Sequence, residues 1–173
     1  GSTTIYIVQG ADFEVKAKGY ANLLPYLKTT VENDVLSVRY ENTSNVRNDN
    51  SEVFITMPVL TGLSSGGSAD MHVTGEFSGN TNFDAHISGS ADITVEKGSA
   101  ENFVLHSSGS GSFGSFGFTS QNADIAISGS GEAKITVGQK LKVKINGSGS
   151  VYYKGNPATV DNDISGSGKV IKQ

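Results

Sequence analysis

The fold is decided by the stretch Ile127-Ser128-Gly129-Ser130-Gly131-Glu132, close variants of which recur through the last two thirds of the chain. Glycine adopts the positive φ angles of sharp bends without a Cβ penalty, so the phrase predicts a tight turn. The copies fall about twenty residues apart, with index serines at Ser68, Ser90, Ser110, Ser130, Ser148 and Ser167. Self-similarity at this period is typical of a solenoid, in which each repeat forms one coil stacked on the last.

Apolar and polar residues alternate on both sides of each turn. The apolar residues occupy every second position: Phe83, Ala85 and Ile87 before one turn, and Ala91, Ile93 and Val95 after it. Alternation of this kind is what strands with one buried face require. No segment has helical periodicity, so each coil must close through strands and bends. We therefore predict an all-β, β-helix-like solenoid over residues 61–173, with about six coils of roughly 20 residues each.

Residues 1–60 lack the glycine phrase. We predict that they form an N-terminal β-strand region that is continuous with the solenoid and caps it. Residues 4–8 form a β-branched and aromatic run, and residues 13–17 alternate as a half-buried strand would, with Phe13, Val15 and Ala17 inward. Two further strands, 27–31 and 35–40, flank a hairpin turn. A strand over residues 53–58 ends at Pro58.

Composition excludes several classes of function. The 173 residues carry a net charge of −4 with no basic cluster, which argues against a nucleic-acid partner. The absence of cysteine excludes thiolate catalysis and thiolate metal sites. No apolar run approaches the roughly 18–20 residues that span a bilayer. The chain opens Gly1-Ser2 without an initiator methionine, and we expect that an upstream signal segment has been removed.

The repeated phrase also resembles a known family. The segments 87–92, 127–131, 145–149 and 164–168 are similar to the auto-transporter adhesin head, GIN-domain family of exported Bacteroidetes proteins. The segments 23–25, 31–36, 55–58 and 151–157 follow the same family in order. The resemblance implies an all-β, β-helix-like fold and a location outside the cytoplasm, at the cell surface, in the periplasm or secreted. It brings no catalytic residues and no cofactor.

Equivalent positions of successive coils form columns, which allows a search for sites. Two residues after the index serines, Asp70 and Asp92 become neighbours on adjacent coils. Carboxylate oxygens are ligands that Ca²⁺ prefers, and an acidic pair also serves sugar chemistry. Exposed carboxylates at solvated turns are the more ordinary interpretation.

Four residues before the index serines, His86 and His106 stack one coil apart on the outward face. Two imidazoles can hold a transition metal, although such sites normally want a third or fourth ligand. Two solvent-facing histidines on a polar column are the ordinary alternative. The third histidine, His72, lies alone in another column.

Aromatic residues offer a further candidate contact surface. Phe116 and Phe118 lie in a phenylalanine cluster over residues 112–118, and Tyr152 is placed outward by the parity that puts Val151 and Tyr153 inside. Exposed aromatic rings suit contacts with sugars or protein partners, whereas inward rings fill the coil.

These patterns favour a non-catalytic, extracytoplasmic binding or adhesion scaffold that contacts glycans or surface proteins. No serine phrase follows a strand and opens a helix as a nucleophile elbow would. The main alternative is a carbohydrate-active β-helix enzyme, a lyase or hydrolase, which rests on analogy of fold alone. A second alternative is a structural spacer. Because an uncovered coil leaves an open sheet edge, association of copies through the solenoid ends is also expected.

Overall fold

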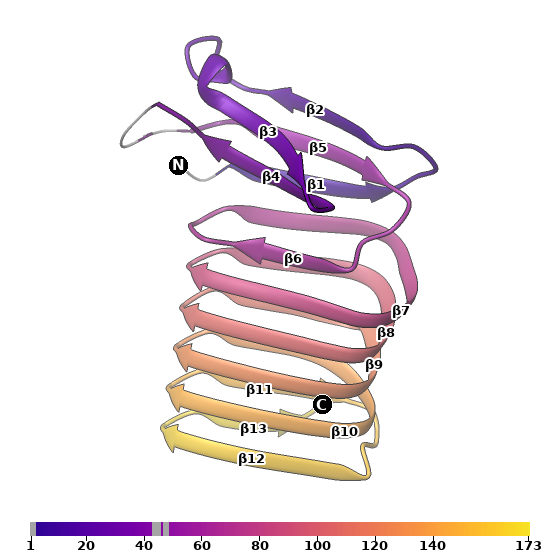
Figure 1. The fold of residues 1–173 in the computed structure, drawn as a ribbon. Helices are drawn as coiled ribbons and strands as arrows, with labels where there is room; N and C mark the ends of the chain where they lie inside the picture. The colour runs from indigo at the N-terminus through magenta and orange to yellow at the C-terminus, as the bar shows by residue number, and fades with distance from the viewer. Residues whose placement is uncertain (1–2, 43–45, 47–48) are drawn as a thin grey trace.

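The computed structural model describes residues 3–42, 46 and 49–173 and is a β-solenoid of about six turns (Figure 1). Its strands are β1 (Thr4–Gln9), β2 (Glu14–Lys18), β3 (Leu27–Glu32), β4 (Val35–Tyr40), β5 (Glu52–Met57), β6 (Gly62–Ser65), β7 (Asp70–Gly89), β8 (Asp92–Gly109), β9 (Ser112–Gly129), β10 (Glu132–Gly147), β11 (Ser150–Lys154), β12 (Thr159–Gly166) and β13 (Lys169–Lys172). One 3₁₀ turn, η1, covers Leu24–Tyr26. The all-β solenoid predicted from the repeat is confirmed.

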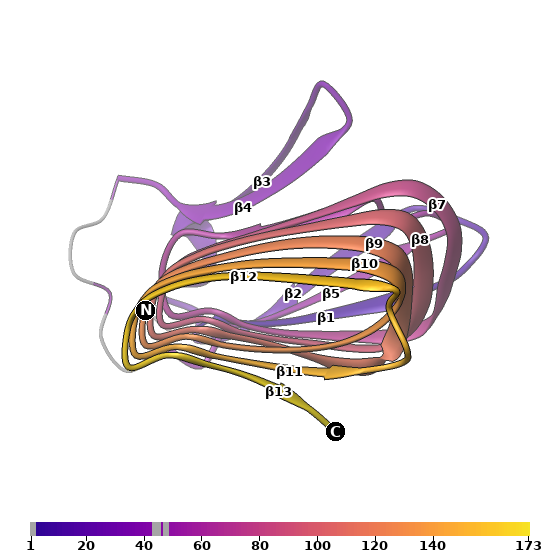
Figure 2. The same ribbon diagram turned by 90° about the horizontal axis from the view of Figure 1, so that it is seen from below.

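The coils are flattened, with two broad faces joined by bends (Figure 2). Face A contains β5, β1, the opening residues of β7 to β10, β11 and β13. Face B contains β6, the closing residues of β7 to β10, and β12. The glycine phrases form the bend from face B to face A, and residues near 75–79 and 96–99 form the other. Neighbouring coils pair in parallel, as the repeat requires.

The N-terminal strand takes a place that sequence order does not indicate. β1 pairs in parallel with β5 on one side and with β7 on the other, so it is inserted between strands that follow it in the chain. Ile5 and Ile7 are buried there, in line with Val53 of β5 and Met71 of β7. The region before the repeat therefore contributes two strands to face A itself.

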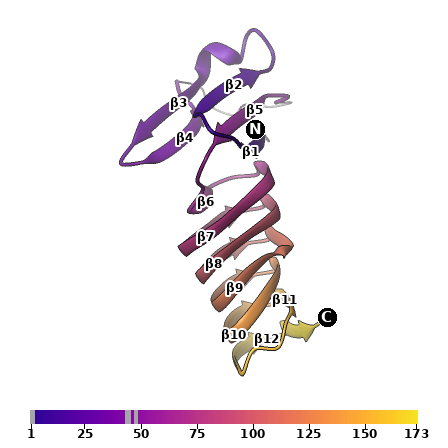
Figure 3. The ribbon, with the colours of Figure 1, turned by 90° about the vertical axis from the view of Figure 1, so that its right-hand side faces the viewer.

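The predicted hairpin is confirmed as β3 and β4, which pair antiparallel around Asn33 and Asp34. Both turn residues have positive φ angles, 50° and 63°, as a two-residue type I′ turn needs. The hairpin projects to one side of the solenoid (Figure 3). Leu27, Leu36 and Val38 pack against the core, while Val31 near the tip is 70% exposed.

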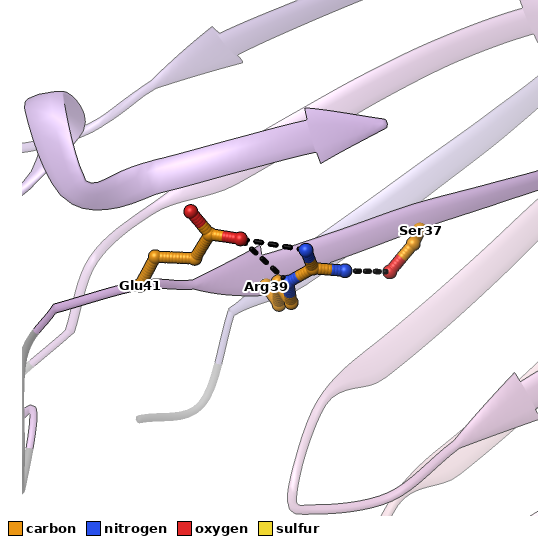
Figure 4. Close-up of polar contacts among 3 residues, drawn as sticks. All are labelled: Ser37, Arg39 and Glu41. Carbon is orange, nitrogen blue, oxygen red and sulfur yellow. Dashed lines mark hydrogen bonds and ion pairs between the residues drawn. The ribbon is translucent and has the colours of Figure 1, made fainter. Parts of the chain in front are cut away.

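The hairpin's other side is polar. Arg39 donates to one carboxylate oxygen of Glu41 through Nε at 2.9 Å and Nη2 at 2.6 Å (Figure 4). Its Nη1 also donates to Ser37 Oγ at 3.4 Å. These contacts are solvent-exposed, so they orient the strand surface more than they stabilise the fold.

One expectation for this region is wrong. β2 exists, but none of its residues is half-buried in the predicted alternation: Phe13 just before it is 76% exposed and Val15 is 39% exposed. The physical reason is its position, because β2 pairs only with β5 at the outer limit of the sheet. Alternation of apolar and polar residues gives a strand two different sides. The apolar side is buried only where another layer of the protein covers it.

A single hydrophobic core runs the length of the solenoid between the two faces. Residues of the predicted inward parity fill it, among them the fully buried Phe83, Phe103, Leu105, Ile125 and Leu141. The rings of Phe103 and Phe113 lie 5.0 Å apart between centroids. At the last coil the same parity is less covered, since Val160 and Ile164 of β12 are 38% and 39% exposed. End-to-end association of copies stays a prediction.

The glycine phrase is fixed by contacts between successive coils. Gly129 has a φ of +122°, and a Cβ there would run into the carbonyl oxygen of Gly109. The Ser130 amide donates to that same oxygen at 2.8 Å. Equivalent amide-to-carbonyl bonds of 2.9–3.0 Å link Ser90 to Gly67, Ser110 to Gly89, Ser148 to Gly129 and Ser167 to Gly147. The bend therefore needs glycine both for its backbone angle and for close stacking.

Replacing Gly129 by Ala is expected to destabilise the protein by about 1–3 kcal/mol, because the new Cβ meets both the strained φ and the neighbouring carbonyl. Gly114→Ala is the matched control, since a Cβ at Gly114 has no neighbour closer than 3.9 Å. Alanine there should leave the stability unchanged or slightly raised. Urea unfolding of both variants measures the difference, and equal losses would contradict the account.

Candidate functional site

A column of aligned outward positions crosses face A from the N-terminal strands to the last coil, with side chains at every position except Gly114. Its register is set by the strand pairs of β5, β1, β7, β8, β9, β10, β11 and β13, which align Phe54, Tyr6, His72, Thr94, Gly114, Lys134, Tyr152 and Ile171. We call this set the face A column. Parallel strands lie about 4.8 Å apart, so Phe54 and Tyr152, six strands apart, are separated by roughly 29 Å.

The first part of the column is aromatic. The rings of Phe54 and Tyr6 stack with centroids 5.1 Å apart and planes within 12°. Tyr6 stacks in turn on His72 at 5.5 Å. The expectation that His72 lies alone is therefore wrong. Because the rings cover one another's faces, this part of the column offers ring edges and polar tips to a partner.

The second part of the column combines an aromatic ring with charge. Lys134 Nζ lies 5.8 Å from the centre of the Tyr152 ring and 2.6 Å from the carboxylate of Glu132. The hydrogen bond to Glu132 raises the pKa of Lys134, so the ammonium group stays charged. Tyr152 points outward as predicted and is half-buried. Hydroxyl, ammonium and carboxylate groups thus meet at one place on face A.

The two phenylalanines singled out from the sequence have different environments. Phe116 is half-buried at the bend beside face A, with Lys154 Nζ 4.5 Å from its ring centre. Phe118 is fully buried, 4.8 Å from Phe83 between ring centroids, and cannot meet a ligand at the surface. The difference arises at the bend, where Ser115 Oγ accepts a hydrogen bond from the Phe118 amide at 2.8 Å. The alternation of buried and exposed residues shifts by one residue at this point.

Phe118→Ala is expected to cost about 3–5 kcal/mol of stability, because it empties a fully buried ring site. Phe116→Ala at the half-buried site should cost roughly 1 kcal/mol, mainly its contact with Lys154. Denaturant unfolding of the two variants compares them. A larger loss at Phe116 than at Phe118 would show that the burial described here is wrong.

The acidic pair lies on face A beside the glycine bends. Asp70 is opposite Thr4 of β1, and Asp92 is opposite Ser112 of β9, whose hydroxyl donates to the Asp92 carboxylate at 2.6 Å. Over the described residues, no group of three or more His, Asp or Glu side chains is placed to hold a metal ion. The Asp92 carboxylate already has a hydroxyl partner in Ser112. A calcium site at this pair stays a prediction.

The histidine pair lies on face B, with the two side chains outward and one coil apart as predicted. His86 and His106 are opposite each other on β7 and β8, with ring centroids 5.3 Å apart and planes within 18°. They line a shallow groove of about 350 Å³ together with serines of β6 to β9, Ala126 and Lys144. No carboxylate lines this groove.

A further electrostatic feature lies in the N-terminal cap. Burial raises the pKa of Asp49, but hydrogen bonds from Thr3, the Ser51 amide and Tyr40 outweigh it and hold the pKa below its usual value. Thr3 and Tyr40 each donate to Asp49 at 2.8 Å. This network joins the segment before β1 to the end of β4 and the start of β5, which assigns it a structural role.

Residues 1–157 match the model of the family described as "Putative auto-transporter adhesin, head GIN domain". The chain belongs to this family. No curated protein matches it. The match covers the N-terminal strands and most of the coils, so the face A column as far as Tyr152 lies within the matched region.

Solved structures share the fold of this GIN-domain chain. A "putative adhesin" from Bacteroides fragilis is 21% identical, with a TM-score of 0.76, and the match covers all of this chain and 89% of that one. A "putative lipid binding protein" from Parabacteroides distasonis has the same identity and coverage and a TM-score of 0.58. A "putative adhesin" from the same species is 20% identical, with a TM-score of 0.56, over 100% of this chain and 90% of that one.

Sequence reasoning missed the aromatic part of the face A column in this GIN-domain chain. Tyr6 and Phe54 lie outside the glycine repeat, so no column position could be assigned to them. The signal that could have placed them is the shared apolar parity of Ile5 and Ile7 with Val53 and Ile55, since two such strands suit neighbouring positions in one sheet. Their order in space follows only from the insertion of β1.

Proposed function

We propose that this GIN-domain chain is a non-catalytic binding scaffold, exposed outside the cytoplasm, whose face A contacts glycans. The observation that carries the proposal is the face A column, in which aromatic, hydroxyl and charged groups lie in one line across neighbouring strands. The family description supports an adhesive role and a surface location. Binding of surface proteins through the same face is the second form of the proposal.

The chemistry of the column suits glycans better than apolar ligands. Tyr152 and Lys134 offer a hydroxyl and an ammonium group, and Glu132 next to them offers carboxylate oxygens. Sugars present closely spaced hydroxyls that can pair with such groups, and successive strands place the side chains of the column about 4.8 Å apart. An extended glycan can touch several coils at once, which multiplies weak contacts into useful affinity.

The alternatives gain no specific support from the described residues. An acid-catalysed glycosidase needs two carboxyl groups that flank the bond to be cleaved, and no carboxylate lines the face B groove. The name of one structural relative refers to lipid binding. An enclosed apolar cavity would favour a lipid here, but large side chains such as Phe83, Phe103 and Phe113 fill the core.

Tyr152→Ala is expected to weaken glycan binding about five- to tenfold, since it removes the outward ring and hydroxyl from the column. Tyr20→Ala is the matched control, because Tyr20 is 52% exposed but lies outside face A. The measurement is binding of wild type and both variants to a glycan array, followed by titration with the best ligand. Equal binding by wild type and Tyr152→Ala would place the contact elsewhere.

The absence of a signal on every glycan would reject the glycan form of the proposal. Cell-surface proteins would then be tested with the same two variants. Tyr152→Ala should reduce that binding and Tyr20→Ala should not. If both variants bind as well as wild type, face A is not the contact surface.

A further inference from the structure

His86 and His106 are two metal-binding side chains that form a pair on face B. The residues lie opposite each other on adjacent parallel strands, β7 and β8. Their rings are stacked with centroids 5.3 Å apart and planes within 18°, and both side chains are exposed. The strand register fixes the two Cα atoms, so the pairing does not depend on a mobile loop.

Both imidazoles are available to a ligand. Across residues 3–42, 46 and 49–173, neither ring takes part in a hydrogen bond or an ion pair with another side chain. Their neighbours along the column are Ser64 on one side and Ala126 on the other, which bring no charge. Lys144, one strand beyond Ala126, lies 3.6 Å from Asp163, so its charge is balanced there.

We propose that His86 and His106 bind one divalent transition-metal ion, with copper(II) bound most tightly. Imidazole nitrogen suits copper, nickel and zinc, and affinity for such sites is highest for copper(II). A metal–nitrogen distance of about 2.0–2.1 Å lets one ion bridge nitrogens up to about 4 Å apart. Both side chains are exposed, so their rings can turn out of the stack about the side-chain bonds and bring one nitrogen of each within that span. The site is independent of the proposed glycan contact on face A.

The surroundings define the kind of ion and its strength of binding. The residues that line the groove around the pair include serines, Lys144 and Asn146 but no carboxylate, which disfavours calcium and magnesium. No third His, Asp or Glu side chain joins the pair among the described residues, so water completes the coordination. Two prearranged ligands raise affinity over a single imidazole by about a hundredfold or more, as linked binding groups do.

The test is calorimetric titration of copper(II) into the untagged chain and into single variants. His86→Ala and His106→Ala should each weaken binding by about a hundredfold. His72→Ala is the matched control, since it removes the remaining histidine of the chain, on face A, and should leave copper binding unchanged. Electron paramagnetic resonance should show two equivalent imidazole nitrogens in wild type and one in either variant.

A gain of ligand gives a second, independent readout. Ala126 lies opposite His106 on β9, so Ala126→His extends the column to three imidazoles and should tighten copper binding. Bound copper joins β7 to β8, so it should also raise the melting temperature of wild type but not of the His86→Ala, His106→Ala double variant. Copper binding that survives in the double variant at wild-type affinity, or that His72→Ala removes, would overturn the proposal.

Discussion

The structure depends on one repeated interaction, the hydrogen bond from a turn serine amide to the glycine carbonyl of the coil before it. The contact recurs at five successive bends with lengths of 2.8–3.0 Å. The hydrogen bond can form only because each turn has a glycine, such as Gly129, with a positive φ angle at a place where a Cβ atom would not fit. These bonds fix the rise from one coil to the next. Because the rise is constant, residues at equivalent positions of successive coils line up in columns. The core and both faces follow from that register.

Columns separate what the fold needs from what a partner can contact. Inward columns are apolar and buried, as at Ala85, Ile93 and Leu105, and they leave little freedom for change. Outward columns are free to differ between the faces. Face A carries stacked rings, Lys134 and Tyr152, whereas face B carries the pair His86 and His106, which line a shallow groove together with several serines. The two faces therefore offer different chemistry on one scaffold.

The sequence predicts the repeating part well because its information is local. A glycine phrase every twenty or so residues and strict alternation define the coils, their inward residues and the pairing of His86 with His106. Tertiary position explains what it misses. The insertion of β1 between β5 and β7 has no local signal, so the position of Tyr6 between Phe54 and His72 could not be foreseen. The sequence leaves open which side Phe118 faces, because a bend changes the phase of alternation just before it.

The central claim is that the surface bends are held by bonds between coils. Turns at a protein surface ordinarily exchange their amide hydrogens quickly, because their backbone bonds open easily. Amide hydrogen exchange at Ser110, Ser130 and Ser148 tests the claim most directly. The account predicts protection close to that of core strand amides such as Ile125 and Val143, because each turn amide is bonded to the coil before it. Exchange at the rate of an open surface loop at these serines would contradict it.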